Sequence, residues 1–241
     1  MKSEFKENLI KECIKYGIYL DENKLDKFEK YKNLLIEWNE KINLTAITDE
    51  YQIILKHFID CLEIVKHIEE GSNIIDVGTG AGFPGIVIAI YFEKNVKITL
   101  LDSLNKRINF LENVVKDLNL KNVELVHGRA EELAQNQNYR EKYDLVVSRA
   151  VASLRVLLEY DIPFLKVNGK GLFMKGDNFK EEINDSKNAL KLLNSSIDNK
   201  FEYKYEVEEE TYNRVILEVI KENITSKKYP RMYSQIKKSP L

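Results

Sequence analysis

Residues 73–85 are the segment that most restricts what this chain can fold into. The segment starts with a short apolar run that contains one acid, Asp76, and continues with four glycines within eight residues. The apolar residues 86–90 follow, so the order predicts a buried strand, a tight turn and a helix. Glycine tolerates positive φ and has no Cβ to keep a ligand from the backbone, and Pro84 suits the first turn of a helix. A nucleotide-type ligand is the natural use of such a turn, although a tight connection without a ligand would have the same pattern.

Strand and helix patterns alternate after this point. We expect strands at 73–77, 97–101, 123–127, 143–147 and 171–174, and helices at 84–93, 104–119, 153–165 and near 179–195. Such alternation predicts a parallel sheet that is covered by helices on both faces. Two further strand-like runs, 201–207 and 214–220, are separated by a short polar turn. They predict an antiparallel hairpin at the end of the sheet.

The first 70 residues have helical patterns instead. We expect helices at 3–16 and from Asp21 to Trp38, then an irregular connector over 39–47, and a third helix with Thr48 as its N-cap. The third helix directs apolar side chains toward a core, together with Cys61 and either His57 or Phe58. No linker separates this region from the strands that follow. The expected organisation is a helical cap (1–70), an α/β core (71–222) and a basic C-terminal tail (223–241).

The charge of the chain is dense but balanced, with 37 basic and 39 acidic residues among 241. This balance argues against a protein that coats nucleic acid with its whole surface, but it allows a local basic face. The tail from Thr225 onward has five basic residues and no acid, and we expect it to be mobile unless it docks on the core.

Cysteine and histidine are too few for a scaffold of disulfides or a metal centre. The chain has two cysteines and three scattered histidines, so no metal site is expected and a reducing compartment is favoured. Neither a signal peptide nor an apolar run of the roughly 20 residues that a spanning helix needs is visible. We therefore expect a soluble cytoplasmic protein.

Polar residues at the strand ends indicate where a ligand would bind, since ligands of open parallel sheets lie beyond the carboxyl ends of the strands. Asp102 ends the second strand, where an acid can accept hydrogen bonds from ribose hydroxyls or can cap the following helix. Ala130 and Glu131 follow the third strand and are placed to flank an adenine. Arg149 and Lys175 end the fourth and fifth strands and place cations beside the site.

The position of Asp76 bears on which nucleoside cofactor is bound. Gly80, Gly82 and Gly85 match a dinucleotide-binding pattern, but Asp76 precedes the closer series Gly78, Gly80 and Gly82. An acid at that place would repel a pyrophosphate and would suit a cofactor that carries an ammonium group. S-adenosylmethionine has such a group, and together with the terminal hairpin this favours a methyltransferase.

Several motifs together resemble one family, the bacterial 16S ribosomal RNA guanine-N7 methyltransferases, also known as glucose-inhibited division protein B. The matching segments are 38–46, 57–60, 76–85, 128–131, 148–152, 175–176, 229–231 and the final 240–241. The resemblance spans nearly the whole chain, and the combination is specific although no single motif is. Two departures occur: Cys61 replaces a serine that is usual in the family, and residues 232–236 replace a small, glycine-containing tail segment.

The resemblance implies a Rossmann-like class I methyltransferase with a seven-stranded, mostly parallel sheet, the cofactor S-adenosylmethionine, and 16S ribosomal RNA or the 30S subunit as partner. It also implies that Gly78, Phe83, Ala130, Glu131 and Arg149 contact the cofactor. Asp76, Gly80, Gly82 and Asp102 are also expected to contact the cofactor, but this expectation comes only from their positions at the strand ends. Arg149 and Lys175 would line the mouth where RNA enters, as positioning residues.

Two residues of the cap, Lys56 and His57, could approach the same mouth, but His57 could equally be a buried core histidine. Guanine N7 has a free lone pair, so no catalytic acid or base is expected. The alternatives are a methyltransferase for another RNA, a protein or a small molecule, and an NAD-dependent oxidoreductase that uses residues 80–85. We expect a monomer that binds neither membrane nor metal.

Overall fold

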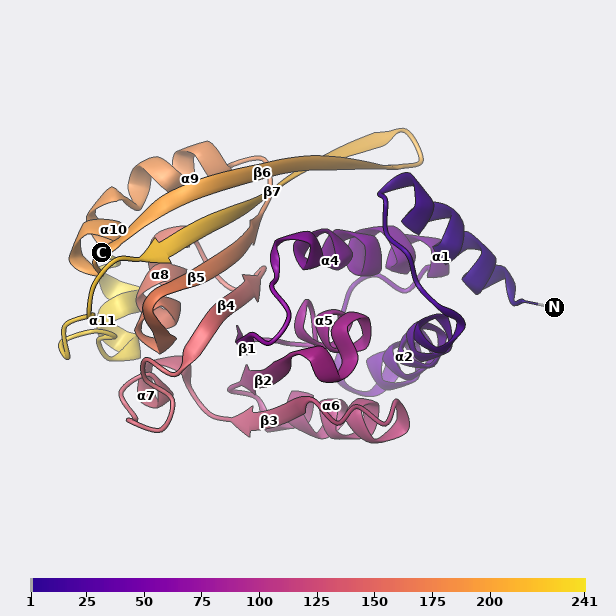
Figure 1. Ribbon diagram of the computed structural model, residues 1–241, viewed down its shortest axis with the longest axis horizontal. Coiled ribbons are helices and arrows are strands. Elements are labelled where there is room, and N and C mark those ends of the chain that lie inside the picture. The colour runs from indigo at the N-terminus through magenta and orange to yellow at the C-terminus, as the bar shows by residue number, and fades with distance from the viewer. Residues whose placement is uncertain (1) are drawn as a thin grey trace.

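A single seven-stranded sheet forms the centre of the computed structural model, which describes residues 2–241 (Figure 1). The strands are β1 (Asn73–Val77), β2 (Lys97–Asp102), β3 (Val123–His127), β4 (Tyr143–Arg149), β5 (Leu165–Lys175), β6 (Ser195–Val207) and β7 (Glu210–Lys221). Their order is β3-β2-β1-β4-β5-β7-β6. The first five strands pair in parallel, whereas β7 is antiparallel to both β5 and β6. The predicted fold class is confirmed.

Helices cover both faces of the sheet, as the alternating pattern predicts. The longer helices are α1 (Glu4–Lys15), α2 (Glu22–Ile42), α5 (Gly85–Phe92), α6 (Asn105–Asp117) and α8 (Leu154–Asp161). The shorter ones are α7 (Ala130–Leu133), α9 (Phe179–Asp185), α10 (Lys187–Leu192) and α11 (Tyr233–Lys238), with 3₁₀ turns η3 (Glu93–Asn95) and η4 (Ile162–Phe164). The expected helices at 153–165 and 179–195 are shorter or divided, because β5 already starts at Leu165 and β6 at Ser195.

Successive side chains of the central strands enter two different apolar clusters. Ile74 packs with α1, α2, α5 and α6 on one face, while Ile75 and Val77 pack with α8 on the other. This alternation follows from the period of two in a strand. It explains why the strands read as nearly continuous apolar runs, since both of their faces are buried.

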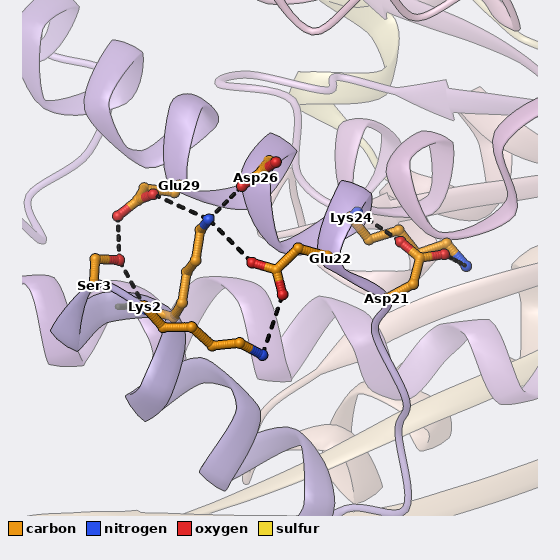
Figure 2. Close-up of polar contacts among 8 residues, drawn as sticks. Lys2, Ser3, Asp21, Glu22, Lys24, Asp26 and Glu29 are labelled. Atoms are coloured by element: carbon orange, nitrogen blue, oxygen red, sulfur yellow. Dashed lines mark hydrogen bonds and ion pairs between the residues drawn. The ribbon is translucent and has the colours of Figure 1, made fainter.

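The N-terminal helices and the core share one continuous apolar cluster. Phe5 of α1, Phe28 of α2 and Ile86 of α5 all belong to it and are buried. The helical region is therefore packed directly on the α/β region, and the division into a cap, a core and a tail stays a prediction. On its outer side α1 is joined to α2 by polar contacts, in which Lys6 reaches Glu22 and Asp26 and Ser3 donates to Glu29 (Figure 2).

Two details of the cap differ from expectation. Asp49, not Thr48, is the N-cap of the third helix, because its carboxylate accepts a hydrogen bond from the Gln52 N–H at 2.9 Å. The second helix continues to Ile42 and ends where Asn43 adopts positive φ. The third helix is a continuous run of α3 (Glu50–Ile53), the π-helix η1 (Ile54–Ile59), α4 (Asp60–Leu62) and the 3₁₀ turn η2 (Glu63–His67).

The basic tail docks on the core. Arg231 pairs with the buried Glu159 of α8 at 2.7 Å, and the short helix α11 follows it, with Ile236 fully buried. We expected the tail to be mobile unless it docks on the core, and the structure shows that it docks. None of the helices within residues 2–241 has the length and apolar character that crossing a membrane requires.

Candidate functional site

The glycine turn between β1 and α5 is held from within by the side chain of Asp76. One carboxylate oxygen, Oδ2, accepts hydrogen bonds from Thr79 Oγ1 at 2.7 Å and from the Gly85 N–H at 2.8 Å. Gly85 has no room for a side chain, because a Cβ there would strike Asp76 and Leu100. Asp76, the next-to-last residue of β1, thus links the start of the turn to the start of α5.

Asp76 is fully buried and is not among the residues that line the two cavities described below. Its second oxygen, Oδ1, has no hydrogen-bond partner among residues 2–241. Burial raises the pKa of this carboxyl to about 7, and the hydrogen bonds from Thr79 and Gly85 offset only part of the effect. The structure therefore shows Asp76 binding within the turn, and its predicted contact with the cofactor stays a prediction.

A cavity of about 160 Å³ lies at the ends of β1, β2 and β3. Gly78, Asp102, Ala130 and Glu131, four of the sequence-predicted residues, line it. Gly78 adopts a φ of +72°, and a Cβ at this position would meet the side chain of Val151 at 2.9 Å. The turn therefore requires glycine here for both its backbone conformation and its close contact.

Asp102 is one of two carboxylates in this cavity, and it is 2% exposed. Its Oδ2 accepts hydrogen bonds from the Gly80 N–H at 2.9 Å and from Arg107 Nη1 at 3.1 Å. Its Oδ1 accepts one from the Leu104 N–H at 2.9 Å, just before α6. A carboxylate has about four lone-pair sites, so one acceptor site of Oδ1 remains for a ligand. Asp102 supports the start of the helix and can still bind a hydroxyl group.

The residues of this cavity fit a nucleoside. Asp102 and Glu131 supply carboxylates for ribose hydroxyls, while Leu101, Tyr160 and Val77 give apolar surface for a base. Glu131 also forms an ion pair with Arg129 at 2.6 Å. The carboxylate acceptors and the apolar walls match what S-adenosylmethionine would require at its adenosine end.

A second cavity, of about 890 Å³, opens at the ends of β4 and β5. Arg149 and Lys175, the two predicted cations, both line it, as do Lys56 and His57 of the cap. Val151, which follows β4, lines both the small and the large cavity. Val151 is therefore the wall between them.

Arg149 is held in place by contacts to the cap. Its Nη1 donates to the Lys56 carbonyl at 3.0 Å and to Asp60 Oδ2 at 2.9 Å, and its guanidinium lies 4.9 Å from the centre of the Phe83 ring. Burial alone would lower the pKa of Arg149, but its interactions with Cys61 and with the Asp60 carboxylate raise this pKa above the ordinary value. The positive charge of this residue is permanent and its position is fixed.

His57 is neutral and packed between other groups. Burial and the charge of Arg149 lower its pKa to about 3. Its Nδ1 faces Arg149 Nη2 at 3.1 Å and must accept, so Nε2 carries the hydrogen and donates to Thr45 Oγ1 at 2.9 Å. The ring also stacks on Phe83 with centroids 4.5 Å apart. His57 borders the large cavity, but both of its nitrogens are engaged within the protein.

The remaining predicted residues lie apart from the small cavity. Gly80, Gly82 and Phe83 belong to the turn: the Gly80 N–H binds Asp102, Gly82 packs on Tyr31, and Phe83 packs under Arg149 and His57. Lys175 Nζ forms an ion pair with Glu182 at 2.7 Å and donates to the Ala152 carbonyl at 2.7 Å.

Several lining residues escaped prediction from the sequence. Tyr205, Tyr212 and Arg214 reach the large cavity from the terminal hairpin, and Lys56 lies 4.7 Å from the centre of the Tyr212 ring. Tyr160 and Tyr233 reach the small one. The hairpin itself was predicted, and the period of two in a strand puts Tyr212 and Arg214 on the same face of β7. No signal in the sequence indicated that this face borders the large cavity.

Comparison with known proteins agrees with this description. Solved structures share the fold, including TYW2 of M. jannaschii in complex with AdoMet (16% identity, TM-score 0.52, 67% of this chain and 76% of that one). A SAM-dependent methyltransferase of Aquifex aeolicus is similar as well (18% identity, TM-score 0.52, 71% of this chain and 94% of that one). The strand order and the terminal antiparallel hairpin are those of the Rossmann-like class I methyltransferase fold.

More specific matches come from the sequence. The family described as GidB, rRNA small subunit methyltransferase G, matches residues 24–211. Ribosomal RNA small subunit methyltransferase G of Clostridium perfringens is 50% identical over 233 residues, 96% of either chain. The protein of the same name from a Thermoanaerobacter species is 47% identical over 243 residues, covering all of both chains. The chain belongs to the rRNA small subunit methyltransferase G family.

Proposed function

We propose that this protein transfers a methyl group from S-adenosylmethionine to N7 of a guanine in 16S ribosomal RNA. One observation carries the proposal beyond family membership: a small cavity suited to a nucleoside and a large cationic and aromatic one share the side chain of Val151. Methyl transfer is a direct displacement between two bound molecules, so the donor site and the acceptor site have to be neighbours.

The small cavity is the proposed cofactor site. Asp102 and Glu131 would bind the ribose hydroxyls, Ala130 would flank the adenine, and Gly78 would allow the close approach of the ligand to the backbone. When bound, S-adenosylmethionine supplies an electrophilic methyl group on a sulfonium. Arg149 would then contribute a fixed positive charge on the acceptor side of Val151, and Phe83 would hold its guanidinium from below. Asp76 would act indirectly, by keeping the turn closed.

The large cavity is the proposed guanine site. N7 is an acceptor on the exposed edge of guanine and has no proton to lose before it attacks. The chain is consistent with this chemistry, because His57 is neutral and bonded at both ring nitrogens and Lys175 is paired with Glu182. Neither residue is free to act as a base. Both therefore serve to position the substrate or the walls around it.

Aromatic and cationic side chains at the rim are suited to an unpaired nucleotide. Tyr212 stacks on Tyr205 with centroids 5.3 Å apart, and the Arg214 guanidinium lies 5.3 Å from the centre of the Tyr212 ring. Bases of single-stranded RNA bind by stacking on aromatic rings and on guanidinium planes, while cations contact the phosphates. We also propose that the protein acts in the cytoplasm as a monomer, on 16S ribosomal RNA or on the 30S subunit.

A methyl-transfer assay tests the proposal directly. The purified protein is incubated with methyl-labelled S-adenosylmethionine and with 16S RNA or 30S particles from cells that lack this methylation. Label at guanine N7 is the expected result, and particles that are already methylated serve as the control. Label that appears only in other RNA, in protein or in small molecules would refute the choice of substrate. A thermal-shift comparison in which NAD stabilises the protein and S-adenosylhomocysteine does not would favour an oxidoreductase instead.

A further inference from the structure

The C-terminal tail is fixed against the side of the sheet that carries the small cavity. Arg231 makes a double contact with Glu159, with Nε at 2.8 Å from Oε1 and Nη2 at 2.7 Å from Oε2. Glu159 is fully buried, and its Oε1 also accepts a hydrogen bond from the Arg231 N–H at 2.9 Å. A buried carboxylate with a bidentate arginine partner is a strong attachment, since separating the two would leave an unpaired charge inside the protein.

A second attachment holds the segment just before it. Arg140 donates to the carbonyl oxygens of Thr225 and Tyr229 at 2.7 and 2.9 Å, and Gln135 donates to the Pro230 carbonyl at 2.9 Å. The segment that leads to α11 is therefore held by two sets of contacts, which end at Arg231. The first residue of α11 is Tyr233.

Tyr233 lies at the edge of the cofactor cavity. It lines this cavity together with Gly78, Asp102 and Ala130, and its ring lies 4.4 Å from the Arg129 guanidinium. The residue is 44% exposed, and no hydrogen bond engages its hydroxyl in the described part of the chain. The side chain presents a ring that nothing else in the protein covers completely.

The same ring also borders a neighbouring cavity of about 500 Å³, formed by the tail and α7. The cofactor cavity alone measures about 160 Å³, whereas ligand sites are typically ~300–1,000 Å³. The space for a nucleoside is therefore limited on one side by Val151 and on the other by Tyr233. Asp102, the proposed ribose ligand, ends β2, and Ala130, the proposed adenine contact, follows β3. Because its ring lies 4.4 Å from the guanidinium of Arg129, the residue before Ala130, Tyr233 lies on the side of the cavity proposed for the adenine.

We propose that Tyr233 is a positioning residue of the cofactor site, and that its ring packs against the adenine of the bound cofactor. This inference rests on the proposed function, because it requires that the small cavity binds the nucleoside. The tail thereby becomes part of the cofactor site, and Arg231 and Arg140 act through it by holding Tyr233 in place. The ring contributes by stacking, and the phenolic hydroxyl has no part in the contact.

Calorimetric titration of the full chain tests the proposal, with S-adenosylhomocysteine and with 5′-methylthioadenosine, which lacks the amino-acid part. Tyr233→Ala should weaken the binding of both ligands at least fivefold, the lower bound for loss of one base–aromatic stack. Tyr233→Phe should bind as the wild type does. Tyr19→Ala, at a tyrosine that is 80% exposed between α1 and α2, is the matched control and should change nothing.

The outcomes separate the two proposals. Unchanged affinity in Tyr233→Ala, when the wild type binds both ligands, would overturn the role of Tyr233 and leave the proposed function intact. A wild-type protein that binds neither ligand would overturn both. A loss in Tyr233→Phe equal to that in Tyr233→Ala would overturn stacking as the cause. Thermal unfolding of the apo variants should match the wild type, since the side chain is partly exposed.

Discussion

The two cavities on either side of Val151 are built in different ways. Asp102 and Ala130, which line the small cavity, follow neighbouring strands, and the topology of a parallel sheet is enough to bring them together. The large cavity combines the end of β4 with side chains from η1 and β7, which are far away in the sequence. The small cavity thus follows from the order of neighbouring strands. The large cavity, the proposed guanine site, depends on how the cap and the hairpin pack against the sheet.

Arg149 is the residue on which the large cavity depends most, and its removal should have the largest effect. Arg149→Ala leaves Asp60 buried without its closest cation, which should lower the free energy of unfolding by about 3–5 kcal/mol. Methyl transfer should be lost as well. Denaturant unfolding and the methyl-transfer assay measure the two effects. Arg155→Ala on α8 is the control, because Arg155 makes no ion pair within residues 2–241. An Arg149→Ala variant with wild-type stability and turnover would show that the substrate side does not depend on this contact.

Asp102 is the corresponding residue of the small cavity. Asp102→Ala should weaken the binding of S-adenosylhomocysteine about ten- to hundredfold, because a charged hydrogen bond to a ribose hydroxyl is lost. Calorimetry gives the affinity, and Asp117→Ala, at the exposed end of α6, controls for the loss of an acid. Reduced stability with unchanged affinity would assign Asp102 to the support of α6 and the glycine turn alone.

Asp76 should give a smaller effect that depends on pH. Its pKa is about 7 in the folded protein and close to the ordinary value of about 3.9 in the unfolded chain, so folding favours the protonated form. The stability that this group contributes is complete below pH 4 and is lost as the pH rises through 7. Asp76→Asn keeps an acceptor for Thr79 and Gly85 but cannot ionise.

Unfolding measured at pH 5.5 and at pH 8 tests this difference. The wild type should lose on the order of 1–2 kcal/mol more than Asp76→Asn over this interval. Asp117→Asn, at an exposed acid, should behave like the wild type. Parallel changes in the wild type and in Asp76→Asn would mean that Asp76 is ionised in the folded protein throughout.

The sequence was most informative where function depends on the ends of consecutive strands. Apolar runs, glycines and the acid at 102 predicted the sheet, the turn and four residues of the small cavity, because each of these follows from local pattern and from topology. The pattern around Asp76 could not distinguish an acid that binds a ligand from one that fastens a turn. That distinction depends on Thr79 and Gly85 lying on the same side as the carboxylate.

Contacts between distant segments were beyond prediction. Arg231 docks the tail by pairing with Glu159, 72 residues earlier in the chain, and only the folded core brings the two together. Tyr212 likewise reaches the mouth because β7 runs antiparallel beside β5. The roles of the cofactor-site residues stay predictions until the binding experiments above are done.

The carboxylate of Asp60 has a consequence for how the protein is made. One oxygen binds Arg149, 89 residues later, and the other accepts a hydrogen bond from the Tyr203 hydroxyl, 143 residues later, at 2.8 Å. Contacts over such distances can form only after the intervening chain has been synthesised. During translation the contact with Arg149 can form first, and the contact with Tyr203 has to wait until β6 has left the ribosome. The substrate side of this enzyme is completed late in its own synthesis, and a chain that stops before residue 203 would leave Asp60 without the partner that fixes its second oxygen.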